Sequence, residues 1–183
     1  LGGSRPPQNR PSNTVTTYGM TETGSGVVYD GIPLEDVQIE IRDSIIHIKA
    51  PMLMRAYRNA DSPFTSDGWF RTGDQGMLDS EGYLSITGRL KEIINRGGEK
   101  ISPREIDDIL MDHPAVGQVV CFGIPHDKLG EEVGAAVVLR EGVAATEKEL
   151  REYVATRVAD FKVPRKILLL EEIPKGATGK LQR

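Results

Sequence analysis

The chain has 183 residues, of which 38% are hydrophobic and 27% charged, and this ordinary globular composition supports one large or two small cores. Its formal net charge of -4, with both signs interspersed, excludes the basic footprint of a nucleic-acid-binding protein. No stretch approaches the length of a membrane span, and the single cysteine, Cys121, lies in an apolar run, so we expect a reducing, cytoplasmic location. Because the chain begins at Leu1 with neither a methionine nor a signal-peptide pattern, we expect a fragment.

The first part of the chain is predicted to be loop-rich and then β-rich. Residues 1–12 are rich in Gly, Pro, Asn and Arg and predict a surface loop. Residues 18–31 are dominated by Thr, Gly and Ser, which predicts an irregular loop carrying Tyr18 and Glu22, with a strand-like patch at 27–29. Alternating or β-branched runs predict strands at 37–41, 45–48 and 83–86, with turns at 67–68 and 81–82.

Residues from about Leu90 onward predict a compact unit of helices and strands. Ser102, Pro103 and Glu105 stand in the order typical of a capped helix start, and a second capping pattern runs from Thr146 to Glu149. The predicted apolar faces of these helices are Ile106, Ile109 and Leu110, and Leu150, Val154 and Val158. Strands are predicted at 119–124, 135–139 and 167–170. The fold class is therefore α/β, more narrowly α+β, with two structural parts that meet near residues 89–91.

The histidines and two of the methionines have structural interpretations. His47 is expected to point outward from a strand, His113 to end a helix and His126 to lie in a turn, so we expect no zinc site. Met52 and Met54 are expected to fill the core.

Two segments of the first part carry side chains suited to nucleotide chemistry. Residues 18–22 combine an aromatic face, a hydroxyl and a carboxylate, which suit adenine stacking, a phosphate contact and Mg²⁺ coordination. Asp74 directly follows Gly73, and a carboxylate there can accept two hydrogen bonds from a ribose diol. An exposed turn or loop explains each segment when it is considered alone.

Two glycine-containing segments lie in the second part. Residues 96–100 join two strand-like runs and predict a hairpin tip, although Gly97 and Gly98 also suit the wall of a narrow channel. In the tail, two glycines and a threonine precede Lys180, which predicts a mobile loop with a cation at its end. The spacing does not fit a phosphate-binding P-loop, and a solvated tail is the simpler interpretation of Lys180 alone.

Four sequence blocks occur together and in order, at residues 18–22, 68–74, 88–103 and 174–180. In this combination the chain resembles the adenylate-forming superfamily, which contains acyl-CoA synthetases, adenylation domains of peptide synthetases and firefly-type luciferases. The resemblance implies that residues 1–89 are the C-terminal, β-rich portion of the large AMP-binding domain. It also implies that residues 90–183 are the small, mobile C-terminal α+β domain.

The resemblance further implies a reaction. A carboxylic acid attacks the α-phosphate of ATP to give an acyl-adenylate and pyrophosphate, and a thiol such as coenzyme A then displaces AMP. The matching positions imply Tyr18 against adenine with Gly19 in the same nucleotide-binding block, Thr21 near the α-phosphate or the acyl carboxylate, Glu22 on Mg²⁺, Asp74 on the ribose hydroxyls, Arg89 on ribose or phosphate, and Lys180 between the acid and ATP. The catalytic candidates are Lys180, Thr21 and Glu22, and the charge of Lys180 would offset the repulsion between two anions.

The small domain of the superfamily rotates between the two half-reactions. Lys91 matches the hinge of this rotation, and Gly97 and Gly98 match a hairpin that lines the pantetheine channel. A hinge consists of a few residues that absorb a large backbone change, which agrees with the boundary predicted near residues 89–91.

The chain departs from the superfamily pattern in three places. Asp43 and Ser44 stand where the superfamily has Gly-Glu, and Ala56 stands where it has Gly. The Ser/Thr/Gly-rich loop that grips the β- and γ-phosphates precedes the first block in the superfamily and is not in this sequence. We therefore expect the fragment itself to be inactive.

The leading hypothesis is an ATP-dependent acid–CoA ligase, with a fatty acid or o-succinylbenzoate as the acid. One alternative is an adenylation domain that loads a carrier protein, and another is a non-catalytic remnant that binds nucleotide or a partner protein. The expected ligands are ATP, Mg²⁺, coenzyme A and a small carboxylic acid, and a homodimer is left open.

Overall fold

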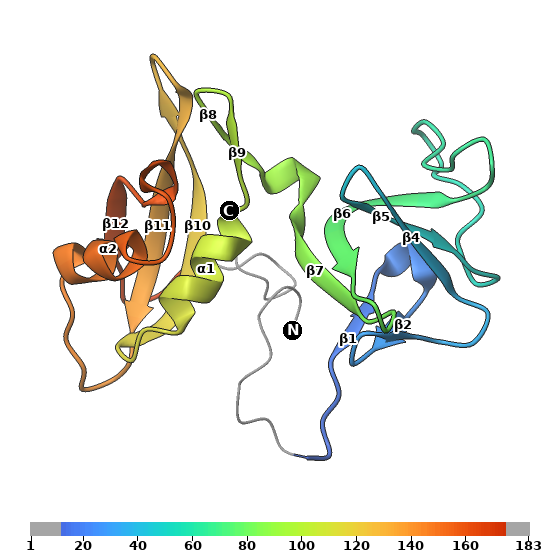
Figure 1. The fold of residues 1–183 in the computed structure, drawn as a ribbon, viewed down its shortest axis with the longest axis horizontal. Coiled ribbons are helices and arrows are strands. Elements are labelled where there is room, and N and C mark those ends of the chain that lie inside the picture. The colour runs from blue at the N-terminus through green and yellow to red at the C-terminus, as the bar shows by residue number, and fades with distance from the viewer. Residues whose placement is uncertain (1–11, 175–183) are drawn as a thin grey trace. The chain divides into compact units, whose positions relative to one another are not determined.

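A computed structural model describes residues 12–174 of the chain. The chain divides into two compact units between Leu90 and Lys91 (Figure 1). Among the described residues, the first unit comprises 12–90 and the second comprises 91–174. No helix within residues 12–174 is long and apolar enough to cross a membrane.

Residues 12–90 contain two antiparallel sheets. The first sheet consists of β1 (Thr17–Gly19), β2 (Gly26–Tyr29) and β3 (Ile32–Pro33), and a short helical turn, η1 (Thr21–Thr23), lies between β1 and β2. The second has the order β4-β5-β6-β7, with β4 at Gln38–Arg42, β5 at Ile45–Lys49, β6 at Phe70–Leu78 and β7 at Leu84–Arg89. Valines of β2 and isoleucines of β5 share one core, which places the β1–β2 hairpin against the larger sheet.

Residues 91–174 form a mixed sheet with helices. A short hairpin of β8 (Ile94–Arg96) and β9 (Glu99–Ile101) is followed by α1 (Pro103–Met111) and a long hairpin of β10 (Val116–His126) and β11 (Gly130–Leu139). The chain continues through α2 (Glu147–Ala155) and the helical turn η3 (Asp160–Lys162) to β12 (Lys166–Leu169), which pairs in parallel with β11. Another helical turn, η2 (Leu90–Glu92), spans the boundary between the two units.

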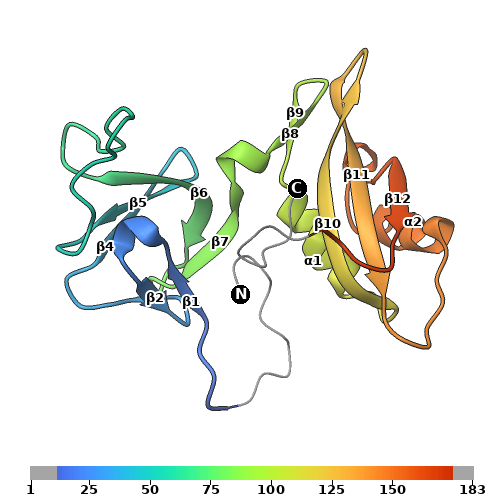
Figure 2. The same cartoon turned by 180° about the vertical axis from the view of Figure 1, so that it is seen from behind.

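Both helices cover the same face of the long hairpin. Ile106 and Leu110 of α1 and Leu150 and Val154 of α2 are fully buried against alternate residues of β10 and β11, including Cys121. Because successive strand residues point to opposite faces, Val120 and Ala136 lie on the other face, where they pack with Ile173. The segment that follows β12 crosses this second face (Figure 2).

Most predicted elements are confirmed. The strands predicted at 37–41, 45–48, 83–86, 119–124, 135–139 and 167–170 correspond to β4, β5, β7, β10, β11 and β12, and both predicted helices form. The Thr146 capping box is complete, since Thr146 Oγ1 accepts from the Glu149 N–H at 3.2 Å and Glu149 Oε2 accepts from the Thr146 N–H at 2.7 Å. Together these elements confirm the α+β class.

Several local predictions are wrong. Tyr18 lies in strand β1 rather than in an irregular loop, because residues 17–19, of which Thr17 and Tyr18 favour strands, pair with β2. Ser102 makes no side-chain cap bond to α1, whose Glu105 carboxylate instead contacts Lys162 Nζ at 2.8 Å. Val158 packs on the core but lies beyond the end of α2.

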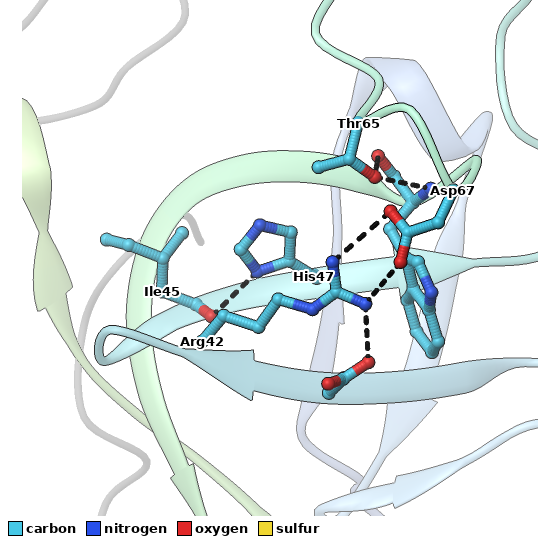
Figure 3. A network of polar contacts seen from close by, with 7 residues as sticks. Arg42, Ile45, His47, Thr65 and Asp67 are labelled. Atoms are coloured by element: carbon cyan, nitrogen blue, oxygen red, sulfur yellow. Dashed lines mark hydrogen bonds and ion pairs between the residues drawn. The ribbon is translucent and has the colours of Figure 1, made fainter.

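His47 and Met52 also differ from expectation, in opposite directions. His47 is 5% exposed, because the turn that precedes β6 and the Arg42 side chain lie beside it (Figure 3). Met52 is 43% exposed, since it lies in the turn directly after β5 instead of reaching the core. Met54 is half-buried.

Candidate functional site

An irregularity in β6 determines where Asp74 lies. Between β5 and β6, Ile45 pairs with Gln75 and His47 pairs with Arg71. Two steps along β5 therefore correspond to four steps along β6, and the extra residues of β6 form a bulge between Arg71 and Gln75. Bulges re-aim side chains and are common beside active sites, and this one contains Asp74.

The bulge is built by the residues that precede Asp74. Gly73 has a φ of 75°, a left-handed conformation that glycine adopts without strain. Thr72 Oγ1 donates to the carbonyl oxygen of Ile46 at 2.8 Å and accepts the N–H of Asp74 at 3.0 Å. In the Thr-Gly-Asp order, Gly73 thus supplies the backbone conformation that the bulge needs. Thr72 supplies hydrogen bonds in place of those that the bulge interrupts in the ladder.

The Asp74 carboxylate is buried and held by two side chains from other strands. The whole residue is 4% exposed, and its Oδ2 accepts a hydrogen bond from the hydroxyl of Tyr18 at 2.9 Å. Its Oδ1 accepts Nε of Arg89 at 2.6 Å, from the residue directly opposite in β7. Arg89 itself keeps a side-chain exposure of 58%, so the cluster Tyr18–Asp74–Arg89 reaches the surface through its guanidinium. We call these residues the Asp74 cluster.

Tyr18 is the neutral member of the Asp74 cluster. Burial of the phenol, followed by the negative charge of Asp74, raises the pKa of Tyr18 well above its ordinary value. The hydroxyl therefore stays protonated at neutral pH and donates to Asp74. The hydrogen bond fixes the hydroxyl end of the half-buried ring, and the position of Tyr18 in β1 sets the direction in which the ring faces point.

Glu22 lies on η1 and is held by the long connection between β5 and β6. Its carbonyl oxygen accepts the Met54 N–H at 2.8 Å, and its carboxylate Oε1 accepts the hydroxyl of Tyr57 at 2.7 Å. This hydrogen bond to Glu22, together with partial burial, raises the pKa of Tyr57. The bond occupies one oxygen of the carboxylate and orients the other.

The donor set at Glu22 suits Mg²⁺ bound largely by phosphates and water. Mg²⁺ prefers oxygen ligands and commonly takes only one or two protein carboxylates beside a nucleotide. Within residues 12–174 no group of three or more His, Cys, Asp or Glu side chains is arranged to hold a metal. The single carboxylate of Glu22, held by Tyr57, fits a site in which phosphates and water supply most of the Mg²⁺ ligands.

The other two candidate site residues of the first block, Thr21 and Gly19, have different environments. Thr21 is exposed at the start of η1. Gly19 lies where β1 meets β2 so closely that a Cβ would overlap the carbonyl oxygen of Ser25 and lie 2.6 Å from Cα of Gly26. Only glycine fits there, so the close approach of β1 and β2 explains why residue 19 is a glycine.

An ion-pair network fixes the turn that leads into β6 (Figure 3). The Arg42 guanidinium contacts both carboxylate oxygens of Asp67, at 3.3 and 2.8 Å, and Glu40 at 2.9 Å. The hydrogen bonds from Arg42 hold the pKa of Asp67 well below its usual range. Arg42 also lies 5.4 Å from the centre of the Trp69 ring. Asp67, directly before the second block, and Trp69 within it therefore help to hold the turn.

Gly97 and Gly98 form the two-residue tip of the β8–β9 hairpin, as predicted. Arg96 pairs with Glu99, and the two glycines have φ values of 60° and 98°. Positive φ at both central residues is what a tight hairpin turn of this kind requires. Lys91 is exposed in η2, at the boundary between the two units.

The structure brings together three of the predicted site residues, Tyr18, Asp74 and Arg89. Glu22 forms a second cluster with Tyr57, and Lys180 lies outside the described residues. Sequence reasoning missed Tyr57 and Thr72. A hydroxyl next to a Gly-Asp pair was a signal for Thr72, whereas the contact of Tyr57 with Glu22, 35 residues away in sequence, had none.

Comparison with known proteins supplies relatives for both units. Residues 105–180 match the family model for the AMP-binding enzyme C-terminal domain. An oxalate–CoA ligase of Arabidopsis thaliana is 46% identical over 139 residues, 74% of this chain and 27% of that protein. A probable 2-succinylbenzoate–CoA ligase of Mycobacterium tuberculosis is 38% identical over 175 residues, 92% of this chain and 46% of that protein.

A solved structure has the same fold. The o-succinylbenzoate CoA synthetase of Bacillus subtilis, in complex with the acyl-adenylate intermediate, superposes with a TM-score of 0.78 at 35% identity. The match covers 91% of this chain and 39% of the synthetase. The chain thus spans less than half the length of the proteins it matches.

Proposed function

The chain belongs to the adenylate-forming family of AMP-binding enzymes, and from this premise we propose that it is part of an ATP-dependent carboxylic acid–CoA ligase. In the first half-reaction, a carboxylate oxygen attacks the α-phosphorus of ATP, and pyrophosphate leaves. In the second, the sulfur of CoA attacks the acyl carbon and loses its proton, and AMP leaves. The proposed assembly assigns residues 1–89 to the end of the large AMP-binding domain and 90–183 to the small mobile domain.

The observation that carries the proposal is the Asp74 cluster. A buried carboxylate that already accepts from Tyr18 and Arg89 keeps lone pairs for two further donors, because each of its oxygens has two. A ribose diol supplies two hydroxyl donors side by side. The neighbouring phenol ring of Tyr18 offers an apolar surface for adenine, and the exposed Arg89 offers a cation for ribose or phosphate.

The remaining roles complete the site in this proposal. Glu22 would hold Mg²⁺, which would neutralise phosphate charge, and Thr21 would contact the α-phosphate or the acyl carboxylate. Gly19 would allow the nucleotide to approach the β1 backbone closely. Lys180 would bridge the acid and ATP, and Lys91 would be the hinge that exchanges Lys180 for the Gly97–Gly98 hairpin. We place the enzyme in the cytoplasm.

The acid is proposed as a class. The relatives named above act on oxalate and 2-succinylbenzoate, and both acids carry a second carboxylate. We therefore add short dicarboxylic acids to the fatty acids and o-succinylbenzoate considered from the sequence.

The test is acid-dependent exchange of pyrophosphate into ATP by the full-length protein, measured over a panel of fatty acids, oxalate and o-succinylbenzoate. We expect one class to support exchange, and CoA to convert the same acid into a thioester. Exchange without CoA consumption, but with loading of a carrier protein, would instead identify a peptide-synthetase adenylation domain. If no acid supports exchange, the proposed activity is wrong.

A further inference from the structure

Two neighbouring carboxylates at the start of β11 reach across to β8. Glu131 and Glu132 are consecutive in the strand, and each contacts a different residue of the arm that carries the Gly97–Gly98 tip. Regular ladder pairing between β8 and β11 is limited to a single pair, Gly130 with Arg96. Side chains therefore take over the attachment of this hairpin where the ladder ends.

Glu132 holds Arg96 through a partly buried ion pair. Arg96 Nε donates to Glu132 Oε1 at 2.6 Å, and the same oxygen accepts the N–H of Val133 at 3.1 Å. The exposed fractions of the two side chains are 28% for Arg96 and 9% for Glu132. A pair that is largely withheld from water has well-defined geometry, unlike a surface ion pair, which water and salt weaken. Arg96 directly precedes the first tip glycine.

Glu131 holds the backbone of the next residue. Its Oε2 accepts the N–H of Asn95 at 2.7 Å, in the place of a ladder bond. Gly123 of β10, which pairs with Val133 two residues farther along β11, leaves room for the Glu131 side chain, since a Cβ there would overlap Oε1 of Glu131 and lie 2.9 Å from its Cδ. Residue 123 is therefore a glycine because a larger residue would collide with the Glu131 side chain.

A backbone contact completes the attachment at the tip. The N–H of Gly97 donates to the carbonyl oxygen of Leu129 at 2.8 Å, and Leu129 lies in the turn between β10 and β11. The glycine tip is therefore fastened to the long hairpin at Gly97, Arg96 and Asn95, three consecutive residues. Its other arm, β9, continues into α1.

We propose that Glu131 and Glu132 are positioning residues for the thioester-forming step, which they serve by holding the Gly97–Gly98 hairpin rigidly against the β10–β11 turn. This inference rests on the proposed function, in which the hairpin lines the channel for the CoA thiol. Neither carboxylate touches substrate in this role. A small displacement of the tip would narrow or misalign the channel without changing the Asp74 cluster, which belongs to the other unit.

The kinetic test compares the two half-reactions in full-length Glu131→Ala and Glu132→Ala enzymes. We expect pyrophosphate exchange to stay within about twofold of wild type and the rate of thioester formation to fall by about tenfold or more, since small misplacements cost that much. Glu131→Gln, whose amide oxygen can still accept from Asn95, should restore the rate. Glu141→Ala, an exposed carboxylate in the same unit, is the matched control. Equal loss in both half-reactions, or no loss in either, would overturn the proposal.

Amide hydrogen exchange of the same proteins gives a readout that does not depend on activity. We expect faster amide hydrogen exchange over residues 94–101 in Glu131→Ala and Glu132→Ala, no change in Glu141→Ala, and unchanged exchange in β10. Gly123→Ala should reproduce the effect of Glu131→Ala by displacing the Glu131 side chain. If the wild-type protein activates no acid, the proposed function is wrong. The amide hydrogen exchange data still test whether Glu131 and Glu132 hold the hairpin. Unchanged exchange at 94–101 in all three variants would overturn the attachment itself.

Discussion

Asp74 and Arg89 face each other across β6 and β7, and Arg89 Nε lies 2.6 Å from Asp74 Oδ1. The pair is asymmetric, because the Asp74 side chain is 5% exposed and the Arg89 side chain 58%. The exposed cation shields the buried anion from solvent while keeping donors at the surface. Such an arrangement keeps the Asp74 carboxylate oriented before any ligand arrives, which lowers the cost of binding.

Asp74→Asn tests the proposed ribose contact. An amide has only one acceptor oxygen, so it cannot accept from both ribose hydroxyls while also accepting from Tyr18. We expect the KM for ATP to rise by about 10- to 100-fold, which corresponds to the loss of a hydrogen bond to a charged group. Steady-state pyrophosphate exchange on the full-length enzyme measures this, with exposed Asp61→Asn as control. An unchanged KM would remove Asp74 from the nucleotide site.

Gly73→Ala tests whether the bulge positions Asp74. An alanine at a φ of 75° is strained, which should cost about 1 to 2 kcal/mol of unfolding free energy. Gly142→Ala is a matched control in the other unit, since Gly142 has a φ of 73° and, like Gly73, open space around a Cβ.

Both alanine variants should unfold at lower urea concentration, but only Gly73→Ala should also raise the KM for ATP. If the two variants raise the KM for ATP equally, or neither does, the bulge has no specific part in nucleotide binding.

Tyr57→Phe removes the hydroxyl that donates to the Glu22 carboxylate at 2.7 Å. The carboxylate then loses its orientation, and we expect the Mg²⁺ concentration for half-maximal pyrophosphate exchange to rise by about tenfold, the low end of the effect of losing an outer hydrogen bond to a metal ligand. Tyr83→Phe, another exposed tyrosine of the same unit, serves as control. The same Mg²⁺ dependence in both variants would contradict a role of Tyr57 in orienting Glu22.

Lys91→Pro tests the proposed hinge. Proline fixes φ and restricts the residue before it, so we expect thioester formation to be impaired while adenylation is spared. Lys91→Ala, which retains backbone freedom, should keep both half-reactions. Stopped-flow measurement of each half-reaction on the full-length enzyme gives the result, and equal loss of both would count against a hinge at this position.

Glu149 gives a pH-dependent contribution to the stability of α2. Hydrogen bonds from the Thr146 N–H and hydroxyl lower the pKa of Glu149. A carboxylate with a lowered folded-state pKa contributes stability that is complete above its unfolded pKa, about 4.3, and is lost as pH falls through the folded pKa.

Urea unfolding of wild type and Glu149→Gln should therefore show a stability difference at pH 7 that shrinks by pH 3. Glu141→Gln should show no such difference at either pH. A difference for Glu149→Gln that does not depend on pH would mean that the charge of Glu149 contributes nothing to the cap.

Local patterns were sufficient for many of the elements. The Thr146 capping box and the β-branched runs of β4, β5 and β10 predict elements because they satisfy backbone groups and bury faces within a short stretch. Residues 70–78 gave no such signal, because the bulge interrupts the alternation of β6 with Thr72, Gly73 and Asp74. The same residues that hide the strand from sequence analysis create the candidate site.

The sequence alone determined the family, the order of the four blocks and the residue types at the candidate site, because these depend on identity and spacing. Only the tertiary structure decided which of them meet. It places Tyr18 and Asp74 in contact across 56 positions and brings Tyr57 to Glu22. It also brings Glu131 and Glu132 of β11 into contact with the glycine hairpin. Contacts between distant strands follow from strand register and bulges. Register and bulges are set when the core of each unit packs, not by any local pattern.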